Sequence, residues 1–383
     1  MNRWLIAPAL ALLALASQAA TLHIGVVQRD DDERLDARRV ELAYPGHPGG
    51  AIEQAVTMAV GETQFELDAA KLQVKVDVVA VRSADDVKVQ FAALEKAGAA
   101  AIVADVPAAW LGAATMLPVV NAGAADDGLR GTACLPNLFH TLPSERMRAD
   151  ALAQALLVRK WSRVLLLQGP RTDDAARLAV VQASLKRFGL NVVATKPFKL
   201  SSDPRERELG NPLLLTTGID YDVVWVVDSD GEFARALPFR TALPRPVVGD
   251  GGLVAQAWGS NFERFGAPQL ARRFARAAKR PMTAHDWAAW IAAKAVLQAA
   301  LETPANPTSD SVRKALARDG FVLDGFKGVR LSFRAWDRQL RQPLLLTDGV
   351  GVVGLAPADG VLHPKNVLDT LGADAPESQC KTK

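Results

Sequence analysis

The sequence of 383 residues contains only two cysteines and five histidines, and its lysines and arginines form no dense basic block. The histidines are scattered and no Cys-x-x-Cys motif occurs, so we expect no metal site. The net charge is only +3, and acidic residues are interleaved with the basic ones. This balance is typical of an ordinary solvated surface, and it gives no indication of a nucleic-acid partner.

Long apolar runs are also absent after the first 20 residues. The chain begins with Arg3, an apolar run over residues 5–16 and the small residues Ser17-Gln18-Ala19. This order predicts a secretory signal peptide that is cleaved after Ala19 or Ala20, and the run is too short to span a bilayer comfortably. No cysteine lies near the cleavage point, so we expect no lipid anchor. We therefore predict an exported protein and interpret its compartment as a bacterial periplasm.

The two cysteines, Cys134 and Cys380, both lie in the part predicted to be exported. An even count in an oxidising compartment permits one disulfide, which would join the end of the first half of the chain to its C-terminal tail. Closing so long a loop stabilises a protein by roughly 5 kcal/mol in the chain-entropy model, and by less where the geometry is strained. Two free thiols are the alternative; we favour the disulfide.

Short apolar runs alternate with helix-like segments along most of the chain. The runs are LHIGVV, LQVKVDVVAV, AAIVAD and LPVVNAG before residue 138, and SRVLLLQG, LNVVATKPF, YDVVWVVD and RPVVGDGG after residue 144. Strand–helix–strand spacing with tight returns is typical of open parallel sheets. The sequence therefore predicts an α/β protein with two similar, Rossmann-like lobes, a cleft between them, and the link LFHTLPS at 138–144.

The predicted division of the chain has five parts. They are the signal peptide 1–20, the first lobe 21–138, the main part of the second lobe 139–248, returning segments shared by both lobes over 249–357, and a polar tail 358–383. Helices are predicted to begin after Ser83, Ser144 and Thr283, because Ser and Thr accept hydrogen bonds from the first turn of a helix.

The candidate ligand site follows from this topology. In open parallel sheets, ligands bind outside the carboxyl ends of the strands, and two facing sheets would place those ends along the cleft. Taken singly, each residue at a strand end is more often a surface or capping residue. The candidates in the first lobe are Gln28, Arg29, Asp105, Trp110, Asn121 and Gly123, and those in the second are Gly169, Arg171, Thr172, Asp173, Asp228, Asp230, Glu232 and Asp250.

Sequence motifs of catalysis are weak. Gly349, Gly351 and Gly354 match GxGxxG, but they do not lie between a predicted strand and a predicted helix, so we interpret them as glycines of a late β-strand. Neither a GxSxG elbow nor a P-loop occurs. Asp286, next to His285, is predicted to cap a helix. We assign no catalytic residue, and an enzyme is the less favoured alternative.

Several stretches are similar to type I periplasmic solute-binding proteins, the branched-chain amino-acid class that serves ABC importers. They are the signal peptide, LHIGVV, the helix near Gly50, AAIVADVPAAW, LPVVNAG and FHTLPSERMRADALAQAL. The family's lobe crossing commonly reads Phe-Arg-Thr-x-Pro-Ser, and residues 139–144 depart from it only at His140. The resemblance spans essentially the whole mature chain. It implies the Venus-flytrap fold with multiple hinge crossings, a small solute in the cleft, an ABC permease as partner, no cofactor and a monomeric protein.

The resemblance also implies that the lobes close by a hinge motion at their crossings. We expect the first crossing at 138–144, with Phe139, His140 and Thr141 as hinge residues. The second is expected near 248–252, and the third between 318 and 346.

A narrower resemblance rests on the tail GLAPADGVLHPKNVLDTLGADAPESQC and on the opening VQRDDD. Both look like the subgroup associated with pyrroloquinoline quinone (PQQ)-dependent alcohol dehydrogenase systems. This implies a link to PQQ-dependent alcohol oxidation, with a periplasmic alcohol dehydrogenase as a further partner. The alternative function is a sensory or scaffold module that partners a dehydrogenase or a receptor.

The expected ligand follows from departures from the family pattern. Amino-acid binders usually carry a Gly-Pro…Ser loop after the third strand, where this chain has residues 104–110 with Trp110. The Ala/Ser-Thr pair that the family usually has after the fourth strand is replaced by Asn121-Ala122-Gly123. The Tyr-Gly pair often found after the first strand of the second lobe is replaced by Gly169-Pro170-Arg171-Thr172. We therefore do not expect leucine-type binding. A tryptophan with several arginines suits a flat, anionic, aromatic ligand, and PQQ or a related quinone acid is our hypothesis.

Overall fold

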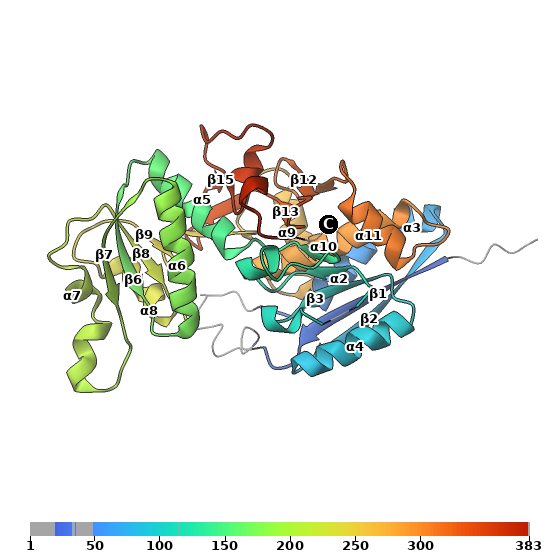
Figure 1. The fold of residues 1–383 in the computed structure, drawn as a ribbon, viewed down its shortest axis with the longest axis horizontal. Helices are drawn as coiled ribbons and strands as arrows, with labels where there is room; N and C mark the ends of the chain where they lie inside the picture. Colours follow the sequence, from blue (N-terminus) through green and yellow to red (C-terminus); the bar gives the residue numbers. More distant parts are fainter. Residues whose placement is uncertain (1–19, 33–34, 36–48, 114, 382–383) are drawn as a thin grey trace, which may run out of the picture.

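The computed structural model describes residues 20–32, 35, 49–113 and 115–381, and the predicted signal peptide before Ala20 lies outside these ranges. The chain forms two lobes, each built on a parallel sheet (Figure 1). The first sheet has the order β2-β1-β3-β4-β5 and contains β1 (Ala20–Arg29), β2 (Leu72–Val81), β3 (Ala101–Asp105), β4 (Val119–Asn121) and β5 (Leu138–His140). The second has the order β7-β6-β8-β9 and contains β6 (Arg163–Gln168), β7 (Asn191–Pro197), β8 (Val223–Val227) and β9 (Val247–Gly249). The predicted α/β class with two Rossmann-like lobes is confirmed.

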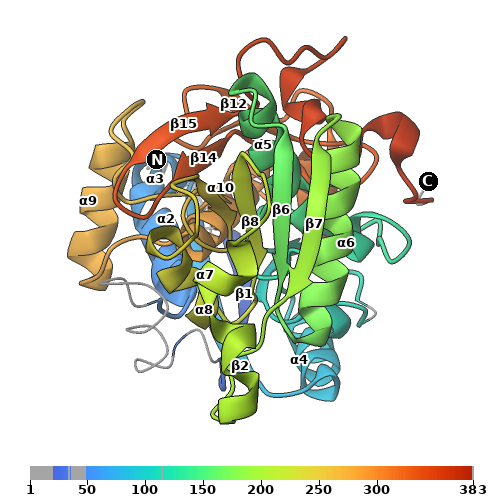
Figure 2. The same cartoon turned by 90° about the vertical axis from the view of Figure 1, so that its left-hand side faces the viewer.

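Helices cover both faces of each sheet, as parallel sheets require. The helices are α2 (Glu53–Glu62), α3 (Gln64–Ala69), α4 (Ala84–Lys96), α5 (Glu145–Val158), α6 (Thr172–Arg187), α7 (Pro212–Thr216), α8 (Glu232–Ala236), α9 (Ala267–Ala278), α10 (Ala284–Leu301) and α11 (Ser309–Ala317). In the first lobe, α2 and α10 pack on one face and α4 packs on the other. In the second lobe, α5 and α6 cover one face, and α7 and α8 cover the other (Figure 2). Within the described ranges, no helix has the length and apolarity needed to cross a membrane.

Helix α10 is buried on nearly all sides. Trp287 and Trp290 are buried, and the alanines on the other sides of the helix are buried as well. The reason is that α10 packs between the first sheet, α2 and α11. Its start was predicted correctly, because Thr283 and Asp286 form a reciprocal capping box.

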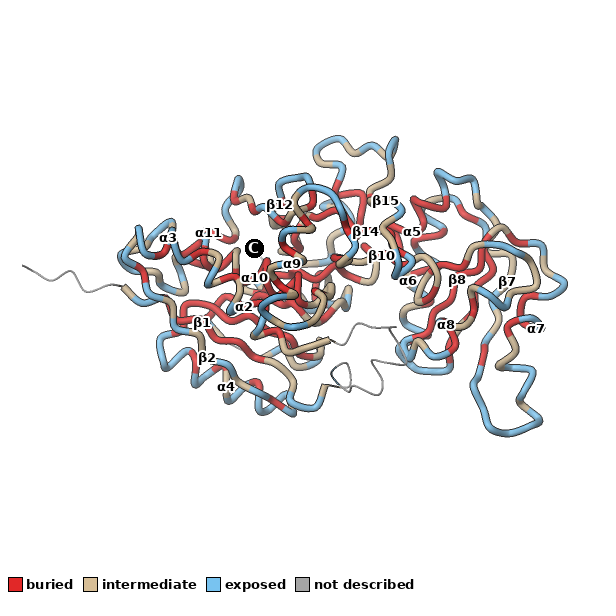
Figure 3. The backbone as a smooth tube through the Cα atoms, turned by 180° about the vertical axis from the view of Figure 1, so that it is seen from behind, coloured by how far each residue is buried: buried red, intermediate tan, exposed pale blue. Residues whose placement is uncertain are grey.

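A small sheet joins the two lobes. It has the order β10-β14-β15 and contains β10 (Val254–Gln256), β14 (Leu344–Thr347) and β15 (Val352–Ala356). In β14, Leu345 belongs to the core of the first lobe, whereas Leu344 and Leu346 belong to the core of the second. Successive strand residues point to opposite faces, so one strand is packed into both cores. Figure 3 shows the buried backbone continuing through β10 and β14 between the lobes.

A hairpin whose turn precedes Gln339 lies beside this small sheet. It consists of β12 (Arg330–Phe333) and β13 (Leu340–Arg341), and β11 (Leu323–Asp324) pairs with β12.

The glycines that match the GxGxxG motif precede no helix. Gly349 and Gly351 lie in the turn between β14 and β15, and Gly354 lies within β15. The predicted boundary between residues 138 and 139 falls inside β5, which pairs with β4 of the first sheet.

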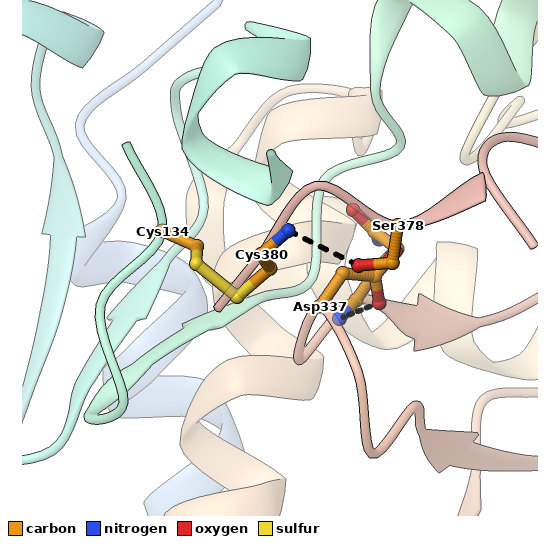
Figure 4. Close-up of a disulfide and its surroundings, with 5 residues drawn as sticks. Cys134, Asp337, Ser378 and Cys380 are labelled. Carbon is orange, nitrogen blue, oxygen red and sulfur yellow. Dashed lines mark hydrogen bonds between the residues drawn. A yellow bond between two sulfur atoms is a disulfide. The ribbon is translucent and has the colours of Figure 1, made fainter. Parts of the chain in front are cut away.

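The predicted disulfide is confirmed. Cys134 and Cys380 are bonded across a sequence separation of 246 residues. The bond joins the loop before β5 to the C-terminal tail (Figure 4).

Candidate functional site

The first-lobe candidates gather at the carboxyl ends of β1, β3 and β4. Gln28 and Asp105 are register partners at the ends of β1 and β3. The Arg29 guanidinium carbon lies 5.5 Å from the centroid of the Trp110 ring, which is within cation–π range. Arg29 also donates from Nε to Asp31 Oδ1 over 3.0 Å. These side chains therefore form a platform with one flat aromatic surface and one guanidinium.

Gly123 lies against the end of β3. A Cβ added at this position would lie 1.9 Å from Asp105 Oδ1 and 2.9 Å from the Asp105 Cα. Real Cβ atoms do not approach other atoms so closely, so a glycine is required here for the loop after β4 to reach Asp105.

The Asn121 side chain is fully engaged within the protein. It is buried, its Nδ2 donates to Ala124 O over 2.8 Å, and it lies 3.0 Å from His140 Nδ1. Its Oδ1 accepts from the backbone nitrogens of Gly123 and Ala124 over 3.1 and 2.8 Å. Asn121 thus shapes the loop that carries Gly123, and its predicted ligand contact stays a prediction.

The second-lobe candidates surround the ends of β6 and β8. Gly169 N donates to Val227 O over 2.8 Å, which joins the two strand ends. Arg171 donates from Nη2 to Asp230 Oδ2 over 2.8 Å, and both side chains are exposed. Thr172, Asp173 and Glu232 are exposed at the first turns of α6 and α8.

Asp174 was missed by the sequence analysis, although it organises this edge. It is buried, and its oxygens accept from the backbone nitrogens of Arg171 and Ser229 over 3.1 and 2.7 Å. It therefore ties the loop after β6 to the loop after β8. Its position at N3 of α6 is the one sequence signal that could have identified it.

Asp228 and Asp250 lie together at the ends of β8 and β9. Asp250 Oδ2 accepts from Asp228 N over 2.8 Å, and Asp228 Oδ2 accepts from Ala234 N over 2.9 Å. Burial raises the pKa of Asp228, although the backbone donors at Ala234 and Gly231 oppose that shift.

Arg177 of α6 links this edge to the start of α5, and it too was missed. Its Nη2 donates to Asp250 Oδ1 over 2.5 Å, and its Nε lies 3.4 Å from Glu145 Oε2. Burial alone would lower the pKa of Arg177, but Asp250 and Glu145 outweigh burial and raise it. Glu145 also pairs with Arg148, whose Nε donates to Ala255 O in β10 over 3.2 Å. No sequence pattern joins these residues, because α5 and α6 are brought together only by packing.

A cavity of about 30 Å³ lies beside this ion-pair cluster. Its lining includes Glu145, Arg148 and Arg177 as well as the apolar side chain of Trp225. Such a volume holds about one water molecule, so the cavity is too small for a solute. Among the described residues, no group of three His, Cys, Asp or Glu residues is placed to hold a metal ion.

The predicted hinge residues lie in a buried polar network. Thr141 Oγ1 donates to Ala288 O over 2.8 Å, and Gln342 Nε2 donates to Thr141 O over 2.7 Å. His140 is buried, and burial together with the nearby Arg130 charge lowers its pKa well below the ordinary value. Phe139 packs edge-on against Phe333 at 5.2 Å between ring centroids.

No protein-family model matches the sequence, and no curated protein matches it either. Solved structures do match. A branched-chain amino-acid ABC transporter periplasmic ligand-binding protein from Burkholderia xenovorans LB400 superposes with a TM-score of 0.71 at 15% identity, covering 94% of this chain and 99% of that one. An ABC-transporter solute-binding protein from R. palustris in complex with benzoate gives 0.66 at 13% identity, covering 95% and 100%.

A third structure is a solute-binding protein of an ABC transporter from Rhodopseudomonas palustris BisB5, in complex with 3,4-dihydroxybenzoic acid. It gives a TM-score of 0.63 at 13% identity, covering 85% of this chain and 92% of that one. Together with two parallel sheets joined through a small shared sheet, these matches show that the chain has the fold of the type I periplasmic binding proteins, whose members among its neighbours belong to ABC transporters.

Proposed function

We propose that this protein is the periplasmic solute-binding component of an ABC importer and that it closes on a small solute between its lobes. The observation that carries the proposal is the pair of parallel sheets, each with polar loops at its strand ends, joined by a sheet packed into both cores. Ligands of open parallel sheets bind at such strand ends. The neighbouring structures that belong to ABC transporters support the same function.

We further propose a planar, anionic, aromatic solute. Arg29 over Trp110 offers a ring face for stacking and a guanidinium for a carboxylate. Two of the neighbouring structures bind benzoate and 3,4-dihydroxybenzoic acid, which are aromatic acids. PQQ or a related quinone acid fits the same description, and it would link the protein to PQQ-dependent alcohol oxidation and to a periplasmic dehydrogenase.

An anionic solute would have to compete with aspartates for the arginines at the strand ends of both lobes. Arg29 is paired with Asp31, and Arg171 is paired with Asp230. Both pairs are partly exposed, and such pairs contribute little stability, so exchanging one carboxylate for another costs little. The solute would therefore replace Asp31 or Asp230 as the partner of a guanidinium.

Calorimetric titration with benzoate, 3,4-dihydroxybenzoate, PQQ and leucine tests the ligand class. We expect an aromatic acid to bind and leucine not to bind. The replacement Arg29→Met should raise the Kd of the aromatic acid by at least about tenfold, which corresponds to about 1.4 kcal/mol of binding free energy. The matched control is Arg264→Met, an exposed arginine of the same lobe, and it should leave the Kd unchanged.

Small-angle scattering tests the function itself. A solute that binds between the lobes should reduce the radius of gyration. If leucine bound and the acids did not, the ligand class would be wrong while the function stood. If no solute in a broad screen caused compaction, the function as an importer component would be wrong. Capture of a dehydrogenase instead of a permease from detergent-solubilised membranes would support the scaffold alternative.

A further inference from the structure

The C-terminal tail, residues 358–380, is bonded to both lobes on the side of the hinge. Figure 1 shows this segment in red between α5 of the second lobe and the β12–β13 hairpin. Its hydrogen bonds and ion pairs involve buried side chains on both sides, so it differs from a loosely attached terminus.

On the second-lobe side, the tail is held by α5 and α6. Gly372 N donates to Asp150 Oδ2 over 2.9 Å, and Arg187 Nη1 donates to Gly372 O over 2.9 Å. Gln154 Nε2 donates to Thr370 Oγ1 over 3.1 Å. Asp150 and Gln154 are fully buried, so these contacts belong to the interior of the lobe.

On the other side, the tail is held by the hairpin. Arg334, which is 1% exposed, donates from Nε to Asp369 Oδ1 over 2.9 Å and from Nη2 to Leu371 O over 2.6 Å. Arg341 Nε donates to the same Asp369 oxygen over 2.8 Å. Trp336 Nε1 adds a bond to Ala373 O over 3.0 Å.

The hairpin itself belongs to the first lobe. Arg338 O accepts from His140 N of β5 over 3.0 Å, and Gln339 Oε1 accepts from Arg130 Nε over 2.9 Å. Leu331 and Leu340 are part of the first-lobe core. Contacts of the tail with the hairpin are therefore contacts with the first lobe.

The end of the tail repeats this arrangement. Glu377 pairs with Arg146 of α5 over 2.7 Å, and three residues later Cys380 is bonded to Cys134 of the first lobe. Figure 4 shows the disulfide beside Ser378, whose Oγ accepts from Cys380 N over 3.2 Å.

The chain between contacts with different lobes is short in both places. Asp369 and Gly372 are three residues apart, as are Glu377 and Cys380, and three residues span at most about 11 Å. Rotation of α5 relative to the hairpin therefore cannot be absorbed by slack in the tail. It must break a bond to one lobe, and breaking a buried charged contact is costly.

We propose that the tail is an interlobe strap, closed by the disulfide, that limits how far the two lobes rotate relative to one another. Lobe rotation matters here because the proposed function requires the lobes to close on a solute, and the proposal rests on that function to this extent. The strap sets the range of conformations available before any solute binds.

Single-molecule fluorescence transfer in the absence of solute tests the strap. Azide-bearing residues in place of the exposed Lys88 of α4 and the exposed Lys186 of α6 carry the dyes and leave both cysteines intact. We expect C134S/C380S to give a broader interlobe distance distribution than the wild type, beyond the spread between replicate preparations. Glu377→Gln, which weakens the second short bridge, should broaden it less.

The matched control is Glu302→Gln, which removes a surface ion pair to Arg318 away from the tail. It should leave the distribution unchanged. Circular dichroism verifies that each variant folds; if the double-serine variant does not fold, Glu377→Gln decides. Distributions identical to the wild type in every folded tail variant would overturn the strap. Because no solute is present, that result is separate from failure of the proposed function, which would appear as no solute-induced shift in the wild type.

Discussion

The Lys327 ammonium nitrogen lies 3.6 Å from the centroid of the Trp287 ring, in the interior of the first lobe. Lys327 also donates to Gln342 Oε1 over 2.7 Å and to Pro343 O over 3.1 Å. Gln342 in turn donates to Thr141 O in the predicted first crossing. Through Gln342, the lysine therefore links residues 327–343 to the segment 138–144, with no carboxylate bound to it in the described part of the chain.

The first prediction concerns pH. Burial lowers the pKa of Lys327 well below its ordinary value of about 10.4. Between the folded and unfolded pKa values the unfolded chain binds more protons, so the free energy of unfolding rises with pH and this contribution is complete only above about pH 10.4. The wild type should therefore lose stability relative to Lys327→Met as the pH decreases from about 10 to 7. The free energy of unfolding of the wild type minus that of the variant should fall by up to about 1.4 kcal/mol per pH unit.

Urea unfolding at three pH values measures this difference. The exposed Lys96→Met is the control and should follow the wild type at every pH. Parallel curves for wild type and Lys327→Met would show that the ring and the two oxygens hold the ammonium charged in the folded protein.

The second prediction concerns the disulfide. Replacement of Cys134 and Cys380 by serine should lower the free energy of unfolding by roughly 2–5 kcal/mol, because the unfolded chain is no longer closed into a loop. Chemical denaturation of wild type and variant at equal ionic strength measures the loss. A loss below about 1 kcal/mol would mean that the tail stays attached through its other bonds even in the unfolded ensemble.

The third prediction concerns the loop after β4. Gly123→Ala should destabilise the protein by about 1–3 kcal/mol and displace Asp105, because the added Cβ collides with that residue. Gly112→Ala is the control, since a Cβ there meets no atom within 4 Å. Thermal unfolding gives the stability, and solute titration reports whether Asp105 lies in the site. Equal stabilities for the two alanine variants would mean that the loop moves freely away from β3.

The fourth prediction concerns Asn121. Asn121→Ala leaves the buried His140 ring and two backbone donors without their partner, so it should cost about 2–4 kcal/mol. Asn306→Ala, at an exposed position of the same lobe, should cost less than about 0.5 kcal/mol. If Asn121→Ala abolished solute binding while stability stayed at the wild-type value, Asn121 would be a ligand contact and not a residue that shapes the loop.

The strands were predictable because parallel strands buried on both faces appear as continuous apolar runs. AAIVAD and YDVVWVVD correspond to β3 and β8, and all five residues of each strand are buried. Helix starts were predictable because a capping residue bonds to the turn that directly follows it, and Thr283 forms the expected reciprocal capping box. At Ser83 only half of the box forms, because Asp86 accepts from Arg82 N and not from Ser83 N.

Contacts within the candidate site were predictable only where two residues follow neighbouring strands of the same sheet. Gln28 and Asp105 meet because β1 and β3 pair in register, and Arg171 and Asp230 meet because β6 and β8 are neighbours. Arg177 was not predictable, because its partners Glu145 and Asp250 come from another helix and from the loop that follows β9.

The sequence by itself determined the two-lobed α/β class, the strand runs, the helix starts and a pair of cysteines available for one disulfide. These are set by local periodicity, by capping chemistry and by composition, which act within a few residues. Only the tertiary structure decided that β14 packs into both cores, that Lys327 lies against Trp287, and that the tail bonds to both lobes. Those contacts join residues that are distant in the chain, and their free energy exists only after packing has excluded water from between them.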